Sequence, residues 1–335
     1  MIAEHPFAQY VRILGKGKTG SRSLNADEAY AAMGMIMRSE VEDVQLGAFL
    51  MLLRVKEESF EELAGFVRAV RETLQAPSIA VDLDWASYAG KRRQQPWYLL
   101  AALALADSGL RVFMHGAAGH TAERIYSEHV LAELGEATAR DWQDVSSKLE
   151  QGNFAYLPLA QFSPPLQRMI DLRAQFGLRS PVHTLSRLLN PLAADYSIQS
   201  IFHPAYADNH QQAAALLGQA HAVVFKGEAG EAERKPEADC RVKSVHNGHL
   251  SEAEWPRMLD GRQEKLSELP TTELLNAWRD EHISEYGRLA IQGTIAIALQ
   301  LRSPELNQEE CLAQASAIWN QRNRQRLSAT ATENL

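Results

Sequence analysis

Three consecutive cations, Lys91 to Arg93, occupy a segment of the sequence where an anion could bind. The segment 89–97 (AGKRRQQPW) follows a predicted strand at 78–83 and precedes a predicted helix at 98–108. In a strand–loop–helix unit, ligands bind at the loop because the helix N–H groups point outward there. Cations at a helix N-terminus oppose the helix dipole unless an anion joins them. The segment therefore predicts a phosphate site, with an ordinary solvated basic turn as the alternative.

The composition of this loop is unusual for a phosphate site. Loops that bind phosphate through the backbone are rich in glycine, whereas this one contains only Gly90. Phosphate would have to be bound here by side chains. Three histidines, His115, His120 and His129, lack the Cys or carboxylate spacing of a metal site, so we expect no bound metal.

Composition excludes several classes of protein. The chain has 335 residues, of which 45% are hydrophobic and 23% charged, as in an ordinary globular protein. A net charge of −8 excludes a uniformly basic nucleic-acid binder, so any basic site must be a local patch. Cys240 and Cys311 fit no metal spacing and predict a reduced, cytoplasmic protein. The N-terminus has no apolar signal core, and the longest apolar run is too short for a membrane span.

The spacing of apolar residues divides the chain into two kinds of structure. Residues 1–75 predict short helices, one of which Asn25 (or Ser23) can cap, with Glu28 as the capping-box partner of Asn25, and residues 163–190 return to this helical domain. Beyond residue 75, β-like runs alternate with helical stretches, which is typical of an α/β sheet. The predicted strands are 78–83, 110–115, 197–203, 222–226 and 240–245. We therefore predict an α/β fold in which a small all-helical N-terminal domain joins a larger α/β domain.

Three segments carry a resemblance to a known family. They are 24–71, with QLGAFL and EELAGF; 164–179, followed by Asn190 and Pro191; and 223–233. In these segments the chain resembles the anthranilate phosphoribosyltransferase family (glycosyl transferase family three). The resemblance implies a nucleoside phosphorylase/phosphoribosyltransferase-like fold. It also implies an α/β domain over 76–162 and 191–330 with a central sheet, a cleft between the domains, and a homodimer formed through the helical domain.

The family's catalytic motifs are altered in this sequence. The glycine-rich motif that binds the pyrophosphate of phosphoribosyl pyrophosphate is replaced by 89–97, and the metal-binding Asp-Glu pair becomes Ala232-Glu233. The Lys-His-Gly-Asn-Arg motif keeps only its His-Gly, and Arg173 remains where the family's arginine contacts the aromatic acceptor. The resemblance therefore implies that anthranilate transfer is lost, with no catalytic residue and no metal. The residual substrate cleft would contain Gly90, His115, Gly116, Arg173 and Glu233.

One branch of this family, the YbiB-like proteins, lacks those motifs and binds nucleic acid. The chain is similar to that branch in 15–18, in Pro96-Trp97 and in 225–234. Basic patches near one cleft would neutralise phosphates and release counterions. The expected nucleic-acid-binding residues are Lys16, Lys18, Arg22, Lys91, Arg92, Arg93, Arg173, Lys226, Arg234 and Lys235. The acidic stretch 228–239 beside the last of them leaves a mutually neutralised charged loop open.

Together these observations predict a cytoplasmic homodimer that binds DNA or RNA through backbone contacts of low sequence specificity. We expect it to need no cofactor. The alternative is a glycosyl or phosphoribosyl transferase with another substrate and with magnesium, in which 91–93 bind phosphate through side chains. The sequence distinguishes neither DNA from RNA nor single from double strands, and it does not indicate the biological process.

Overall fold

The core of the molecule is a mixed seven-stranded sheet in the order β3-β2-β1-β4-β5-β6-β7. The first five strands in this order are parallel, and β6 and β7 form an antiparallel hairpin at one edge. The computed structural model describes residues 3–261 and 264–328. The strands are β1 (Leu83–Ser87), β2 (Val112–Gly116), β3 (Phe154–Pro158), β4 (Tyr196–Ile201), β5 (His221–Lys226), β6 (Cys240–His246) and β7 (His249–Trp255).

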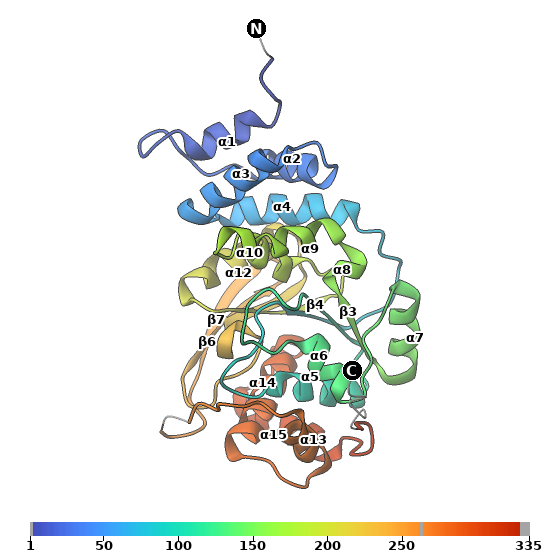
Figure 1. The fold of residues 1–335 in the computed structure, drawn as a ribbon. Helices are drawn as coiled ribbons and strands as arrows, with labels where there is room; N and C mark the ends of the chain where they lie inside the picture. Colours follow the sequence, from blue (N-terminus) through green and yellow to red (C-terminus); the bar gives the residue numbers. More distant parts are fainter. Residues whose placement is uncertain (1–2, 262–263, 329–335) are drawn as a thin grey trace.

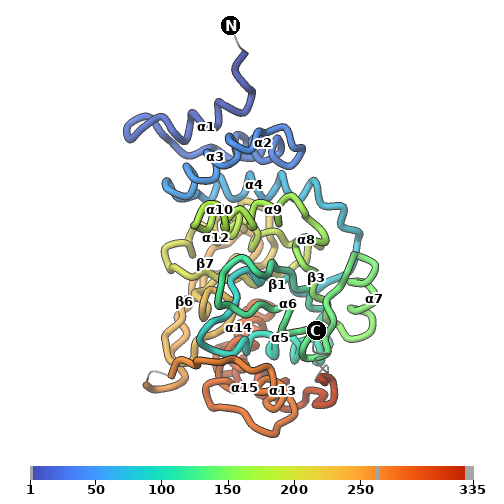
Figure 2. Tube along the Cα trace, in the orientation of Figure 1, coloured from blue at the N-terminus to red at the C-terminus, as the bar shows by residue number. Residues whose placement is uncertain are grey.

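A helical layer covers one face of this sheet and ends the molecule on that side (Figure 1). It contains α1 (Ala8–Gly15), α2 (Ala26–Met37), α3 (Asp43–Lys56), α4 (Phe60–Thr73), α8 (Leu159–Phe162), α9 (Pro164–Asp171), α10 (Arg173–Phe176), α11 (Val182–Leu185) and α12 (Ala207–Leu216). Figure 2 shows that the chain returns to the first four helices near α9 and α10. Because helices and sheet share one apolar cluster, the layer is continuous with the α/β core.

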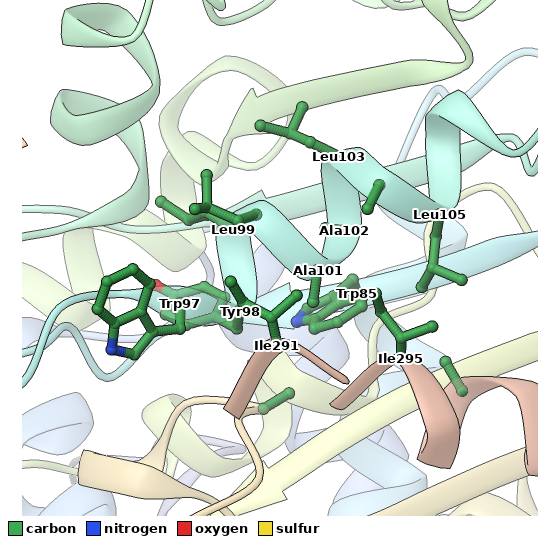
Figure 3. Close-up of a cluster of buried hydrophobic side chains, with 14 of the residues drawn as sticks. Trp85, Trp97, Tyr98, Leu99, Ala101, Ala102, Leu103, Leu105, Ile291 and Ile295 are labelled. Carbon is green, nitrogen blue, oxygen red and sulfur yellow. The ribbon is translucent and has the colours of Figure 1, made fainter. Parts of the chain in front are cut away.

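The opposite face of the sheet is covered by α5 (Trp97–Asp107) and by C-terminal helices. Every residue of α5 from Trp97 to Ala106 is buried, because the helix lies between the sheet and α14. Ile291 and Ile295 of α14 lie beside it (Figure 3). The helices on this side are α6 (Ser127–Glu133), α13 (Thr271–Arg279), α14 (Glu285–Arg302) and α15 (Gln308–Gln321), while α7 (Trp142–Gly152) lies beside β3.

Local sequence signals explain several of these boundaries. Asn25 caps α2 and forms a capping box with Glu28, as predicted, and Ser59 and Glu62 form a second one at α4. The close packing of α2 on α4 depends on Gly65. A Cβ at this position would lie 2.3 Å from the carbonyl oxygen of Ala26.

The predicted α/β fold with a helical N-terminal part is confirmed, with corrections to its strands. The predicted strand 78–83 is wrong, because the strand that pairs in the sheet is Leu83–Ser87. Residues 110–115, 197–203, 222–226 and 240–245 overlap β2, β4, β5 and β6. Two strands, β3 and β7, were not predicted. β3 is a five-residue apolar run between helices, too short to be distinguished from a buried helix segment, and β7 is exposed along much of its length and lacks a clear apolar pattern.

Candidate ligand-binding site

The loop 89–97 lies between β1 and α5, as predicted, but its first three backbone amides are already bonded, that of Lys91 to the carbonyl of Ile125. The N–H groups of Ala89 and Gly90 both donate to Oε1 of Glu231, at 2.7 and 2.5 Å. Burial raises the pKa of Glu231, and the two amide hydrogen bonds oppose that rise. Gly90 has a φ of +72°, which favours glycine. The amides that could bind a phosphate are therefore satisfied by a carboxylate of the protein itself.

Lys91 is an interior residue. Its side chain is 0% exposed, and its ammonium lies 2.6 Å from Glu233 and 2.9 Å from Glu228. The second oxygen of Glu233 accepts the N–H of Tyr98 in the first turn of α5. Burial and the neighbouring Glu228 raise the pKa of Glu233 to about 7, while Lys91 opposes that rise. The positive charge at this helix N-terminus is therefore matched by internal carboxylates, as in the neutralised charged loop that the sequence left open.

These contacts do not fit a magnesium pyrophosphate complex. Such a complex needs free carboxylate or hydroxyl ligands for the metal and free amides for the anion. Here an ammonium occupies the space between Glu228 and Glu233, and Glu231 occupies the amides. Within 3–261 and 264–328 there is also no group of three or more His, Cys, Asp and Glu residues that could hold a metal ion.

The carbonyl groups of the same loop bind arginines from other segments. Arg124 donates through Nη1 to the carbonyls of Ala89 (3.0 Å), Gly90 (2.8 Å) and Ala229 (3.2 Å). Arg179 donates through Nη2 to the carbonyl of Ala89 and to the hydroxyl of Thr121. At Ala89 and Gly90 the N–H groups are thus bonded to Glu231 and the carbonyls to arginines, so this part of the loop is held by side chains that no local pattern reveals.

The structure corrects the prediction for Lys91 and Arg234, because both side chains are buried and cannot contact a nucleic-acid backbone. Arg234 is 0% exposed and donates to four carbonyl groups, including those of Lys235 and Trp255. Its role is to hold the turn before β6 against the end of β7.

The other expected basic residues lie nearer the surface. Lys16, Lys18, Arg93 and Lys226 are exposed. Three more are paired on the surface: Arg22 with Glu28, Arg92 with Glu123, and Lys235 with Glu237. Exposed pairs of this kind leave little charge for a ligand.

The expected residual cleft is only partly present. His115 is buried and its Nδ1 lies 2.7 Å from the Tyr88 hydroxyl, so it faces the interior. Gly116 is required by packing, since a Cβ there would lie 2.0 Å from the carbonyl oxygen of Ser87. Arg173 is half-buried and donates to the carbonyl of His120 at 2.8 Å. The side chain of Glu233 forms an ion pair with Lys91. These residues do not converge on one open site.

A pocket of about 190 Å³ lies where the helical layer meets the C-terminal ends of the parallel strands. Its lining includes four arginines and one carboxyl group: Arg54, Arg124, Arg179, Arg187 and Glu58. We call this the arginine pocket.

The residues of the arginine pocket come from distant segments of the chain. Arg54 and Glu58 come from the end of α3 and the turn after it, and Arg187 comes from a 3₁₀ turn (Ser186–Leu188). Sequence reasoning missed Arg54, Arg124 and Glu58 as site residues. The signal available for Arg124 was its place in the loop after a parallel strand.

Burial shifts the pKa values of several groups in and around this pocket toward their neutral forms. The pKa of Glu58 is raised by burial, which favours its neutral form. Burial lowers the pKa of Arg179 to about 10, and repulsion by Arg124 contributes to the shift. Arginine nevertheless remains cationic at neutral pH. Burial also lowers the pKa of His210 to about 3 and holds that of His183 well below its usual value. The pocket therefore combines neutral imidazoles with an excess of positive charge.

Comparison with known proteins identifies the family. Residues 9–74 match the helical bundle domain of a glycosyl transferase family, and residues 98–269 match the α/β domain of that family. The chain belongs to this glycosyl transferase family. The first range covers α1 to α4, and the second covers all strands except β1 together with α8 to α12 of the helical layer.

Relatives of this family member include enzymes and uncharacterized proteins. An uncharacterized protein of Aquifex aeolicus is 30% identical over 72% of this chain and 74% of its own length. The uncharacterized protein YbiB of Escherichia coli is 27% identical over 71% of this chain and 76% of its own. Anthranilate phosphoribosyltransferase of Geobacillus kaustophilus is 27% identical over 71% of this chain and 70% of its own length.

Solved structures of the family share the fold of this chain. The crystal structure of anthranilate phosphoribosyltransferase from Thermus thermophilus superposes with a TM-score of 0.78 at 22% identity, over 94% of both chains. The Saccharomyces cerevisiae enzyme in complex with PRPP and Mg gives a TM-score of 0.75 at 17% identity, over 95% of this chain and 94% of its own. This glycosyl transferase family member therefore keeps the family's fold around a changed loop. None of the helices among the described residues is long and apolar enough to cross a membrane.

Proposed function

We propose that this glycosyl transferase family member binds a small phosphorylated ligand in the arginine pocket, using side chains in place of magnesium and a glycine-rich loop. The observation that carries this proposal is the charge of the pocket: four arginines line it with a single carboxyl group, Glu58, whose pKa is raised. Guanidinium groups match the geometry of phosphate oxygens and need no metal to do so.

The reaction class of the family supports the same ligand class. In glycosyl transfer from a phosphorylated donor, the protein binds the donor by its phosphate groups. Here the loop 89–97 is not free to do so, because Glu231 binds its amides and Lys91 pairs with Glu233. The arginine pocket lies beside that loop, because Arg124 and Arg179 both line it and bond to the loop carbonyls. A pentosyl transferase that binds its donor through arginines is therefore the activity that we propose to test first.

Calorimetry can test this proposal with the purified full-length protein. Ribose 5-phosphate and phosphoribosyl pyrophosphate are titrated in the presence of EDTA and, separately, of magnesium. We expect binding of at least one ligand in EDTA, with little change when magnesium is added. Absence of binding by both ligands, or binding that requires magnesium, would overturn the proposal.

Nucleic-acid binding is a second candidate, supported by one specific observation. Phe202 lines the arginine pocket and is 48% exposed, so an unpaired base could stack on it while its phosphates meet the arginines. The remaining cations for this function would be the exposed ones, such as Lys226.

Titration of single-stranded DNA at several salt concentrations tests this second candidate. The affinity should fall with salt, with a log–log slope of about −0.7 per phosphate contact. Phe202→Ala should weaken binding, whereas Leu250→Ala removes a similarly exposed side chain from β7 and should not. Undetectable binding, or equal effects of the two variants, would exclude stacking at this pocket.

We also propose that the chain forms a homodimer through its helical layer. Two valines of α3, Val44 and Val55, are 80% and 84% exposed, so this helix offers apolar surface that a second copy would bury favourably. Sedimentation of the 37.3 kDa chain should show twice that mass, and Val55→Asp should reduce it to the monomer. A monomer at micromolar concentration would refute this proposal.

A further inference from the structure

One side chain of the arginine pocket has no partner in the part of the chain that the structure describes. Arg187 is 8% exposed, and within 3–261 and 264–328 its guanidinium has neither a hydrogen bond nor an ion pair. Its pKa is lowered by burial, and the charge of Glu231 partly offsets that effect. Glu231 is itself bonded to two amides and makes no ion pair with Arg187. A largely buried cation that reaches a pocket without a bonded counter-ion is stabilised when a ligand supplies the anion.

Neutral polar atoms around the same pocket are also without partners. Ser180 Oγ, His183 Nε2, His210 Nε2 and Glu58 Oε2 are buried and make no hydrogen bond among the described residues. All four residues line the arginine pocket. Buried polar atoms normally find a partner, so several unsatisfied atoms on residues that line one cavity favour this cavity as a site for a polar ligand.

The unsatisfied atoms differ in what they can bind. Arg187 and Ser180 offer N–H and O–H donors that suit phosphate oxygens. The low pKa values of His183 and His210 keep their imidazoles neutral at pH 7, so each offers one donor or acceptor without charge. Glu58, with its raised pKa, can accept from a hydroxyl group or donate to one. Such a mixture fits one anionic group attached to a hydroxyl-bearing body.

Size narrows the ligand further. The pocket measures about 190 Å³, below the range of about 300–1,000 Å³ that is typical for drug-sized ligands. A nucleotide strand could place only one of its units in such a space. A single phosphate on a small polyhydroxylated compound fits both the size and the chemistry.

From these contacts we propose that the arginine pocket is a binding site for a phosphate monoester of a small polyhydroxylated compound, with Arg187 binding the phosphate. This inference rests on the proposed function and specifies its ligand class. Arg187 is the residue that discriminates phosphate from uncharged analogues, and the neutral groups of the pocket bind the hydroxyls.

The experiment compares ribose 5-phosphate, ribose, inorganic phosphate and pyrophosphate by calorimetry on the full-length protein in EDTA. We expect ribose 5-phosphate to bind most tightly, inorganic phosphate more weakly, and ribose not at all. Arg187→Met should weaken ribose 5-phosphate binding about tenfold to a hundredfold, since a charged hydrogen bond is lost. Arg187→Lys should restore part of the affinity because it keeps the charge without the planar fork.

Two controls separate ligand binding from folding. Arg168→Met removes an exposed arginine that pairs with Asp43 outside the pocket, and it should leave the affinity unchanged. Without ligand, Arg187→Met should unfold at the same or higher urea concentration than the native protein, because a buried unpaired charge is removed. Arg54→Gln provides a surface variant of the same pocket that should weaken binding without affecting the core.

The outcomes separate this inference from the proposed function. If no phosphorylated ligand binds, both fail. If ligands bind but Arg187→Met has no effect, or pyrophosphate binds more tightly than ribose 5-phosphate, the phosphate monoester site is refuted while the broader function stands. Loss of stability in Arg187→Met without ligand would show that Arg187 serves only as a structural partner of Glu231.

Discussion

Replacing Lys91 by methionine tests the buried charge cluster most directly. The change keeps the length of the side chain and removes a cation that lies 2.6 Å from Glu233 and 2.9 Å from Glu228. Breaking a buried ion pair by removing one partner costs about 3–5 kcal/mol, because the remaining carboxylate must either stay unpaired or take up a proton on folding. We therefore expect Lys91→Met to lower the free energy of unfolding by that amount at about pH 8, a large part of a typical total.

The penalty should depend on pH in a defined direction. In the native protein the pKa of Glu233 is raised to about 7 from an ordinary value of 4.5. A raised pKa means that this carboxyl stabilises the folded state fully below pH 4.5 and loses that contribution as the pH rises through 7. Without Lys91, Glu233 should hold its proton beyond pH 8. Between pH 8 and pH 7 the variant then gains about 1.4 kcal/mol of stability on acidification, whereas the native protein, with a Glu233 pKa of about 7, gains much less.

Urea unfolding followed by tryptophan fluorescence measures both effects, since Trp85 and Trp97 are buried near the loop (Figure 3). The midpoint and slope are compared at about pH 8 and pH 6. Arg92→Met is the matched control. It changes the next residue, whose side chain is 48% exposed and pairs with Glu123 on the surface, so it should cost less than about 1 kcal/mol. A penalty for Lys91→Met as small as the control, or one that does not narrow at lower pH, would refute the reasoning.

Three further predictions concern packing, the loop and acid stability. Gly65→Ala should lower the free energy of unfolding by about 1–3 kcal/mol, because its Cβ would meet a carbonyl oxygen at 2.3 Å. The control Gly34→Ala on α2 places its Cβ against only a flexible arginine and should raise that free energy by up to about 1 kcal/mol. Urea unfolding measures both changes. Glu231→Ala should cost at least about 2 kcal/mol, since it leaves two buried loop amides without an acceptor, and a smaller loss would mean that water replaces the carboxylate. His210 has a folded pKa of about 3 instead of 6.5, so its contribution is full above pH 6.5 and is lost as the pH falls toward 3. His210→Gln should therefore reduce the loss of stability between about pH 7 and pH 5 by about 2 kcal/mol, and an unchanged loss would contradict this assignment.

The loop 89–97 shows where sequence reasoning reached its limit. Its position between a strand and a buried helix was predictable, because the apolar runs on both sides have the length and period of those elements. Its chemistry was not. Lys91 and Arg92 are adjacent cations with the same local signal, yet the first is fully buried and the second is on the surface.

The candidate site followed the same division. The basic character of 91–93 and the acidic character of 228–239 were visible in the sequence, and their mutual neutralisation was one of the interpretations left open. Which cations would remain for a ligand was not visible. Arg54, Arg124 and Arg187 come from three distant segments and meet only because the helical layer folds onto the ends of the parallel strands.

By itself, the sequence determined the local features of this protein: the capping box at Asn25, the buried helix α5, the alternation of strands and helices, and the resemblance of the whole to one family. Such features depend on neighbours within a few residues, so the order of residues is enough to predict them. Only the tertiary structure decided which charged side chains pair with one another. Glu233 and Lys91 are separated by 142 positions, and their contact closes the loop that first suggested a phosphate site. Burial then decides which cations pair internally and which, like Arg187, have no bonded partner among the described residues.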